Sequence, residues 1–353
     1  MQSFVYDALP GRVVFGVGSL DGIADEVARL GVAKALVLAT PPQREQAEDV
    51  SRRLGAASAG VFAEAEMHVP IEVAGRARDE ARRLGADCCV AVGGGSTTGL
   101  GKAIALEYGL PIIAVPTTYA GSEMTPIWGL TEDGLKKTGR DPKVLPKTVI
   151  YDPTLVMTLP VGIAGPSGMN AIAHCVEALY AENANPIISM MAEEGIRALA
   201  RSLPNVVGKP DDIEARSDAQ YGAWLAGAAL GSVGMALHHK LCHTLGGTFN
   251  LPHAETHTIV IPHATAFNRE AAPEAMARIA AAMGSDDPAG AIYDLGVAIG
   301  AKMALRDLGL GEADLDRAAD IAVENPYYNP RPITRDGIRA LLDDAFHGRR
   351  PGA

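Results

Sequence analysis

The first 115 residues alternate short apolar runs with stretches of helical spacing. Between the first two runs, Ser19 precedes apolar residues three and four apart, and Gly31 follows where a helix would end. The predicted strands are Arg12–Phe15, Ala35–Ala39, Ala59–Phe62, Cys88–Val92 and Ile112–Val115. Strands that alternate with helices predict an α/β domain with a doubly wound, mostly parallel sheet.

The pattern changes after this region. Ile127–Leu130 and Thr148–Tyr151 are apolar runs on either side of a polar stretch, and we expect them to pair as a hairpin. Later segments carry Ala, Leu, Met and Ile at spacings of three and four, which is typical of helices. The predicted helices include Gly168–Ala181, Ile187–Ser202, Ile213–Leu230 and Glu274–Met283.

Two prolines, Pro153 and Pro160, separate these halves, because the residue before a proline is driven out of the helical region. We therefore expect an α/β domain at residues 1–160 and an all-α domain at residues 161–353. A ligand site is expected in the cleft between them.

The composition restricts the choice of partners. The 353 residues are 48% hydrophobic and carry a net charge of −11, so nucleic acids and anionic membranes would repel the chain. The beginning of the sequence lacks the basic start and apolar stretch of a secretory signal, and no run of 18 apolar residues occurs. We expect a cytoplasmic protein with a small-molecule substrate, whose four cysteines are free thiols.

A glycine-rich segment follows the fourth predicted strand. Its glycines let a phosphate approach the backbone, and the helix that begins there offers unpaired N–H groups. A plain strand-to-helix turn would need only one glycine, and the spacing matches neither common phosphate-loop pattern. The candidate nucleotide-binding residues are Gly94, Gly95, Ser96 and Thr97.

The next predicted strand ends in a second polar loop that contains Thr117, Thr118 and Ser122. In open parallel sheets ligands bind beyond the carboxyl ends of the strands, so the two loops together indicate a dinucleotide site. Many nicotinamide enzymes hold the ribose with an acidic residue after the second strand, but Thr40 stands there in this sequence. We expect NADH, with tolerance of NADPH.

Six of the nine histidines fall between residues 238 and 263. His239 and His243 are four apart and would share one helix face, and His253 follows a glycine pair and a turn. On an earlier helix Asn170 and His174 have the same spacing. A lone histidine is usually a satisfied core residue, but this grouping predicts a functional site.

These motifs resemble the iron-type alcohol dehydrogenase superfamily over nearly the whole chain. They are Gly93-Gly94-Gly95-Ser96, Pro116-Thr117-Thr118, Gly168-Met169-Asn170 with His174, His239 with His243, and Pro252-His253. The resemblance implies a dinucleotide-binding domain followed by a helical domain, with a metal held by one aspartate and three histidines. The matching positions are Asn170, His174, His239 and His253, while His243 matches a histidine near the nicotinamide.

Asn170 replaces the anionic ligand with a neutral amide, which lowers the expected affinity for a metal, so the metal content stays open. The sequence from His238 to His243, and that from Gly121 to Trp128, resemble the maleylacetate reductase branch. That resemblance implies reduction of an unsaturated keto diacid, maleylacetate, to 3-oxoadipate in aromatic degradation.

The roles expected from this resemblance are a proton donor and a carboxylate-binding group. His243 is the first choice for the proton donor, with His239 second, and Lys240 would bind a substrate carboxylate unless it faces away from the site. The alternatives are a metal-dependent alcohol or glycerol dehydrogenase, a sugar-phosphate synthase or lyase of the dehydroquinate synthase type, and a non-catalytic NAD-binding module. A homodimer is expected, as for many soluble enzymes.

Overall fold

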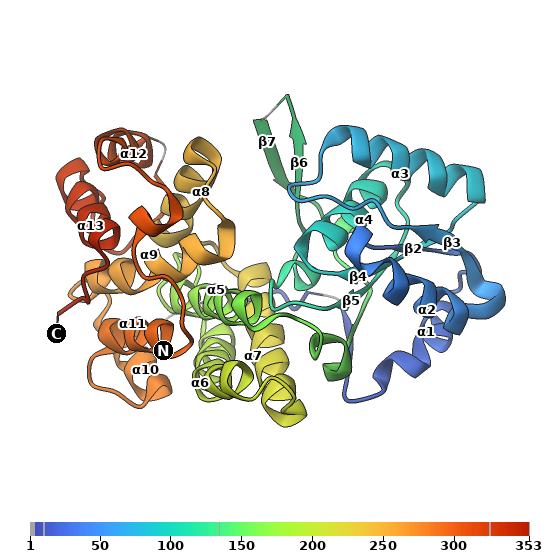
Figure 1. Ribbon diagram of the computed structural model, residues 1–353, viewed down its shortest axis with the longest axis horizontal. Helices are drawn as coiled ribbons and strands as arrows, with labels where there is room; N and C mark the ends of the chain where they lie inside the picture. The colour runs from blue at the N-terminus through green and yellow to red at the C-terminus, as the bar shows by residue number, and fades with distance from the viewer. Residues whose placement is uncertain (1–3, 10, 134, 325, 353) are drawn as a thin grey trace. The chain divides into compact units, whose positions relative to one another are not determined.

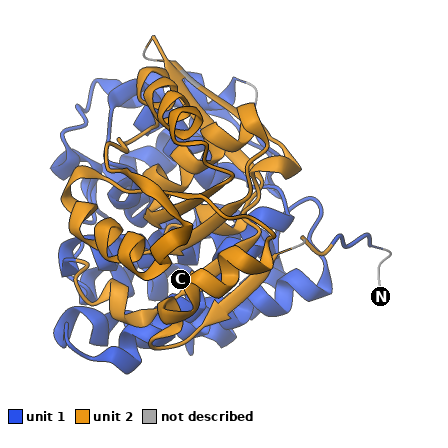
Figure 2. Cartoon of the chain, turned by 90° about the vertical axis from the view of Figure 1, so that its right-hand side faces the viewer, with its two compact units in different colours: residues 1–7, 160–353 blue, residues 8–159 orange. Residues whose placement is uncertain are grey.

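The structure of the protein is a computed structural model, which describes residues 4–9, 11–133, 135–324 and 326–352. The chain divides into two compact units, Ala8–Leu159 and Met1–Asp7 with Pro160–Ala353 (Figure 2). Residues 4–7 thus group with the helical unit, whereas the sequence analysis assigned all of residues 1–160 to the α/β domain.

The unit of residues 8–159 contains a six-stranded parallel sheet in the order β1-β8-β5-β4-β2-β3. Figure 1 labels four of these strands, β2, β3, β4 and β5. The strands of the sheet are β1 (Arg12–Phe15), β2 (Ala35–Leu38), β3 (Ser58–Phe62), β4 (Cys88–Gly93), β5 (Ile112–Pro116) and β8 (Thr148–Tyr151). The helices of the unit are α1 (Ile23–Arg29), α2 (Arg44–Leu54), α3 (Ile71–Leu84) and α4 (Gly95–Tyr108). The doubly wound fold class predicted from the sequence is confirmed.

Helices cover both faces of this sheet, because alternate residues of each strand point to opposite sides. Val90 of β4 packs in a cluster with Val27 of α1 and Val50 of α2. Its neighbour Cys89 packs on the other side, in a cluster with residues of α3 and α4. The four inner strands, β2, β4, β5 and β8, are therefore buried on both sides, which explains their continuous apolar sequences.

The hairpin expected between Ile127–Leu130 and Thr148–Tyr151 is wrong. Thr148–Tyr151 is β8, a buried parallel strand between β1 and β5. The partner of β6 (Ile127–Glu132) is β7 (Leu135–Arg140), which pairs with it antiparallel. An Asp-Gly pair at residues 133 and 134 is a strong hairpin turn signal, and Asp133 has a φ of 51°. The sequence analysis did not predict β7, because most of its residues are polar.

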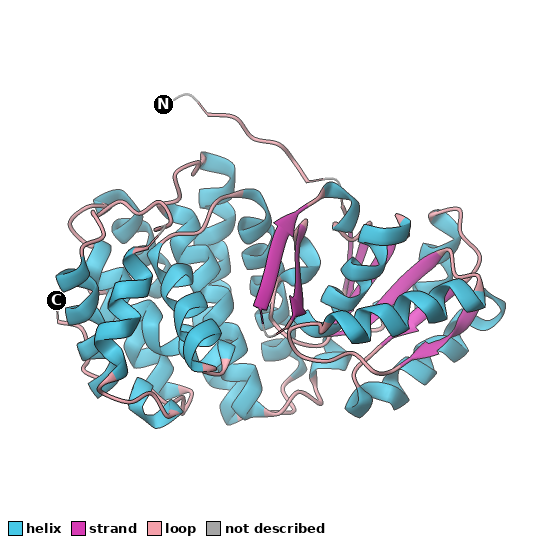
Figure 3. Cartoon of the chain, turned by 90° about the horizontal axis from the view of Figure 1, so that it is seen from above, coloured by secondary structure: helices cyan, strands magenta, loops and turns pink. Residues whose placement is uncertain are grey.

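The unit that begins at Pro160 is helical, and every strand of the described chain lies in the other unit (Figure 3). Helix α5 packs against α6, α7 and α9, and α8 and α9 share a second apolar core with α12 and α13. The helices are α5 (Val161–Leu179), α6 (Pro186–Gly208), α7 (Ile213–Ser232), α8 (Leu237–Phe249), α9 (His253–Asn268), α10 (Pro273–Met283), α11 (Pro288–Ala298), α12 (Asp314–Val323) and α13 (Arg335–His347).

Among the described residues, no helix has both the length and the apolar character needed to span a membrane. All four cysteines are buried and free, as expected.

Glycines let α6 and α7 approach closely. A Cβ atom on Gly222 would lie 2.7 Å from Leu199 Cγ and 3.1 Å from the carbonyl oxygen of Gly195. We expect Gly222→Ala to lower the free energy of unfolding by about 1–3 kcal/mol, because a packed backbone cannot yield to an added methyl group. The measurement is the urea midpoint, followed by circular dichroism.

Gly208→Ala is the matched control, since a Cβ atom added there, at the exposed end of α6, would have nothing within 4 Å. This variant should be neutral or slightly more stable. Equal midpoints for the two variants would contradict the close approach of α6 and α7.

Candidate active site

The predicted nucleotide-binding residues gather at one edge of the parallel sheet. Strands β5, β4 and β2 are neighbours, and all three end at this edge because they are parallel. Thr40 follows β2, Gly94 to Thr97 follow β4, and Thr117 and Thr118 follow β5. Three loops distant in sequence therefore meet at one place.

The contact between the loops after β4 and β5 leaves no room for a side chain. Gly93 has a φ of 153°, and a Cβ on it would clash with Thr97 Oγ1. A Cβ on Gly94 would lie 2.9 Å from Thr118 Oγ1. Gly94 is the N-cap of α4 and no side chain caps this helix, so N–H groups of its first turn are available to a ligand. Such N–H groups suit a phosphate.

A hydrogen-bonded chain of side chains links the loops after β2 and β5. Thr40 Oγ1 donates to Gln43 Oε1 at 2.9 Å, and Gln43 Nε2 donates to Thr117 Oγ1 at 2.7 Å. The sequence analysis missed Gln43, although a polar residue just after the two prolines that follow β2 was a signal for it. Thr40 is thus tied to the rest of the predicted nucleotide site.

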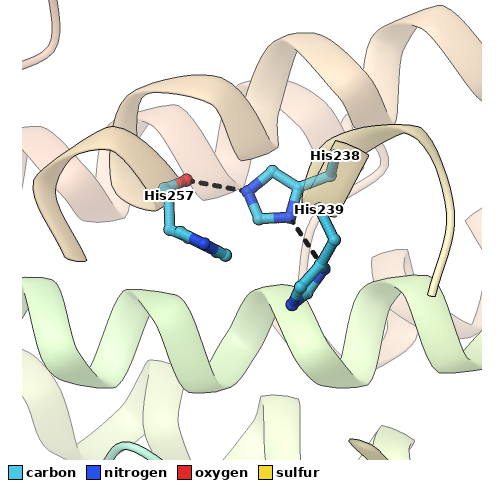
Figure 4. Close-up of side chains that lie close together, drawn as sticks. All are labelled: His238, His239 and His257. Carbon is cyan, nitrogen blue, oxygen red and sulfur yellow. Dashed lines mark hydrogen bonds between the residues drawn. The ribbon is translucent and has the colours of Figure 1, made fainter. Parts of the chain in front are cut away.

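In the helical unit, histidines from α5, α8 and α9 form one cluster. The rings of His174 and His239 stack with centroids 5.1 Å apart, and the ring of His257 lies 4.9 Å from His239 and 4.1 Å from His253. Figure 4 shows His238, His239 and His257 turned toward one another. The structure therefore brings together His174, His239 and His253 as the sequence analysis expected, and it adds His238 and His257.

Glu177 of α5 orients this cluster. Its carboxylate accepts hydrogen bonds from the backbone N–H groups of Ala236 and His238, at 3.0 and 2.7 Å, and lies 2.6 Å from His239 Nδ1. These contacts place the Nδ1 proton of His239 toward Glu177 and leave the lone pair on Nε2. The sequence analysis did not assign Glu177 to the site, although it lies three residues after His174 on the same helix.

Burial keeps the inner histidines uncharged. It lowers the pKa values of His174, His239 and His257 well below the usual range, and the pKa of His238 to about 3. Neighbouring imidazoles lower these pKa values further, because like charges would repel one another. The cluster therefore presents neutral imidazoles.

His243 and Lys240 lie at the outer side of α8 and meet at one aromatic residue. The hydroxyl of Tyr327 lies 3.1 Å from His243 Nδ1, and Lys240 Nζ lies 6.0 Å from the centre of the Tyr327 ring. His243 is exposed and Lys240 is half-buried. The two expected reactive groups thus lie on one side of the helix, together with Tyr327, which the sequence analysis missed because it follows no helical or strand pattern.

Known proteins similar to this chain match it over nearly its full length, and they belong to the superfamily that its motifs resemble. Residues 10–153 match the iron-containing alcohol dehydrogenase family, and residues 165–346 match the C-terminal part of the same family. The maleylacetate reductase of Burkholderia cepacia is 57% identical over 351 residues, which is 99% of this chain and all of the relative. That of Sphingobium indicum is also 57% identical, over 99% of both chains. The crystal structure of maleylacetate reductase from Agrobacterium tumefaciens superposes with a TM-score of 0.97 at 54% identity, over 99% of this chain and all of that one.

The chain belongs to the maleylacetate reductase family. It is therefore an NAD(P)H-dependent oxidoreductase, and the resemblance found in its motifs is confirmed. This family membership does not support two of the alternatives, a sugar-phosphate synthase or lyase and a non-catalytic NAD-binding module.

The implied metal position of this maleylacetate reductase family member holds only neutral donors. Asn170 Oδ1, His174 Nδ1 and His239 Nε2 are buried without a hydrogen-bond partner among the described residues, so they match a cation in donor type. However, no carboxylate stands among them, and the nearest one, Glu177, lies behind His239. A divalent ion would be held less tightly here than by a set that includes an aspartate.

We expect Gly94→Val to raise the Michaelis constant for NADH about tenfold or more, because the branched side chain would displace Thr118 and fill the space beside the helix N-terminus. Gly75→Val is the control, since Gly75 lies in α3 and a Cβ added to it would have nothing within 4 Å. Steady-state kinetics with varied NADH give the answer. A folded Gly94 variant with an unchanged constant would remove this loop from the nucleotide site.

Proposed function

We propose that this protein reduces maleylacetate to 3-oxoadipate with NADH, and accepts NADPH less readily. The observation that carries the proposal is the meeting of His243 and Lys240 at Tyr327, beside a cluster of buried imidazoles. A proton donor and a fixed cation are what a keto diacid needs. The full-length similarity to maleylacetate reductases supports the same substrate.

We assign cofactor binding to the unit of residues 8–159. The pyrophosphate would bind at the N-terminus of α4, with hydroxyl groups of the loops after β4 and β5 as donors. Thr40 stands where many NAD-dependent enzymes have a carboxylate, so no acidic side chain at this position would repel the 2'-phosphate of NADPH. The proposed cofactor-binding residues are Thr40, Gly94, Gly95, Ser96, Thr97, Thr117, Thr118 and Ser122.

The bound nicotinamide would supply a hydride to the carbon–carbon double bond that is conjugated to the ketone, and would itself be oxidised. The protein's own groups would then stabilise the negative charge that develops on the ketone oxygen and deliver the proton that completes 3-oxoadipate. We assign the proton donor to His243, which can exchange protons with solvent because it is exposed. Tyr327 holds its ring by the contact to Nδ1, so Nε2 faces the substrate in this assignment.

The buried imidazoles and Asn170 would line the substrate site as neutral donors. His239 is the second choice as a proton donor, and His174, His253 and Asn170 complete the proposed catalytic set. Lys240 supplies a positive charge for one carboxylate of the substrate. A divalent ion at Asn170, His174, His239 and His253 would polarise the ketone oxygen, but the proposed proton transfer and carboxylate binding require only the protein's own groups.

The enzyme is proposed to work as a cytoplasmic homodimer. The decisive assay follows NADH oxidation on addition of maleylacetate, with a simple primary alcohol and NAD⁺ as the comparison. Oxidation of the alcohol without reduction of maleylacetate would instead favour the metal-dependent alcohol or glycerol dehydrogenase alternative.

We expect the purified enzyme to retain most of its activity after exhaustive chelation, because the neutral side chain of Asn170 weakens the metal position. Asn170→Asp should increase zinc affinity, which calorimetry with zinc alone can measure. Loss of wild-type activity that zinc, iron or manganese restores would overturn the proposed independence from metal.

His243→Ala should lower the turnover number by about 10²- to 10⁴-fold, the usual contribution of a positioned acid or base, with a much smaller effect on the Michaelis constant for maleylacetate. His347→Ala serves as the control, because His347 lies on α13 and contacts Asp343. Normal turnover with collapsed substrate affinity would mean that His243 binds substrate rather than delivering a proton.

Lys240→Met should show the opposite pattern. One substrate carboxylate would lose its charged partner, so the Michaelis constant for maleylacetate should rise about tenfold or more while turnover changes less. Lys302→Met, an exposed lysine of the same unit, provides the baseline. Equal Michaelis constants for the two variants would show that Lys240 does not contact the substrate.

A further inference from the structure

The side chain of Lys102 is fully buried, where a positive charge is energetically costly. It lies on α4, two turns after the glycine-rich segment, and its exposed fraction is 0%. Burial lowers its pKa to about 7, although the nearby Glu123 opposes this shift. A buried lysine needs strong compensating contacts, and an apolar residue would fill the same space at lower cost.

The contacts of Lys102 all reach one segment of chain. Its Nζ donates to the carbonyl oxygens of Ser122 and Ile127, each at 2.7 Å, and to Thr125 Oγ1 at 3.0 Å. Ser122 Oγ lies 3.3 Å away as a fourth acceptor. The three protons of an ammonium group match the three shorter contacts, whereas a neutral amine has two protons and would turn its lone pair toward the third acceptor.

This segment continues directly from the polar loop after β5. It begins with Ser122 and includes Glu123, which is also fully buried and accepts a hydrogen bond from the hydroxyl of Tyr151 in β8 at 2.9 Å. The loop is therefore anchored at one side to α4 by Lys102 and at the other to β8 by Tyr151. Both anchors lie within the α/β unit.

We propose that Lys102 is a positioning residue for the nicotinamide cofactor, which fixes the loop from Thr117 to Thr125 in the shape that receives the pyrophosphate. This inference rests on the proposed binding of NADH by the loops after β4 and β5. Because Ser122 Oγ can accept from Lys102, its own proton is available to a phosphate oxygen. A loop that is ordered before the cofactor arrives loses less entropy on binding.

The test is Lys102→Met, which keeps the length and most of the volume of the side chain and removes its three donors. The carbonyl group of Ile127 would then lose its lysine partner, and that of Ser122 would keep only its contacts from Thr125. The loop would have to rearrange to hydrate the freed groups. We expect the dissociation constant for NADH, measured by its fluorescence without substrate, to rise about 10- to 100-fold. Turnover at saturating NADH and the Michaelis constant for maleylacetate should stay within about threefold of wild type.

Thr125→Val tests the same contact without removing the lysine. It replaces one acceptor of Lys102 by an isosteric methyl group, so the dissociation constant for NADH should rise by a smaller factor, about three- to tenfold. Lys143→Met, an exposed lysine in the same unit, is the control for loss of positive charge. If Lys102→Met does not fold, Thr125→Val decides alone.

If Lys102 only stabilises the fold, Lys102→Met should have a lower melting temperature, while its folded fraction binds NADH with unchanged affinity. That result would overturn the proposal. NADH binding by Gly94→Val shows whether a negative result concerns the role of Lys102 or the proposed nucleotide site itself. Weak NADH binding by Gly94→Val together with normal binding by Lys102→Met and Thr125→Val would reject the role of Lys102 only. Normal binding by all three variants would reject the nucleotide site and the role of Lys102 together.

Discussion

The arrangement of the helical site depends on the carboxylate of Glu177. Helix α8 begins at Leu237 without a side-chain cap of its own, and two of the N–H groups at its start donate to this carboxylate on α5. The same carboxylate contacts His239. One buried acid thus both satisfies the start of α8 and orients an imidazole, so the register of α8 against α5 and the direction of His239 are set together.

A comparable arrangement, with the charges reversed, supports the α/β unit. There a buried ammonium, Lys102, satisfies the carbonyl groups of Ser122 and Ile127 at the end of an irregular loop. A short loop satisfies fewer of its backbone groups internally than strands and helices do, so a buried loop also depends on side chains as partners. In each unit a fully buried ionisable side chain lies directly behind residues that we assign to binding or catalysis.

Much of the fold was predictable from the sequence, because parallel strands buried on both faces have continuous apolar sequences and the long helices have regular spacing. The sequence-based prediction was less accurate for the ends of helices and for the pairing of strands. The predicted helix Ile187–Ser202 ends too early, since α6 continues through Pro204 to Gly208, and α5 begins at Val161, seven residues before the predicted start. The pairing of β8 depended on contacts distant in sequence, which no local pattern records.

The candidate site was predictable to a similar extent. Spacings of four residues placed Asn170 with His174 and His239 with His243, because such pairs share a helix face. Gln43, Glu177 and Tyr327 could not be assigned in this way. Each of them reaches its partner from another element, as Gln43 reaches Thr117 across the end of the sheet. Sequence spacing contains no information on such contacts.

The distribution of charge around the histidines explains why a neutral residue at position 170 suits a dianionic substrate. The inner imidazoles are uncharged, since burial lowers the pKa values of His174 and His239. An aspartate among neutral imidazoles, with no cation to offset it, would repel the substrate's carboxylates. We propose that, with Asn170 in place, no anion at this position opposes the attraction between Lys240 and the substrate. In the described cluster, the carboxylate of Glu177 is satisfied by its own hydrogen bonds.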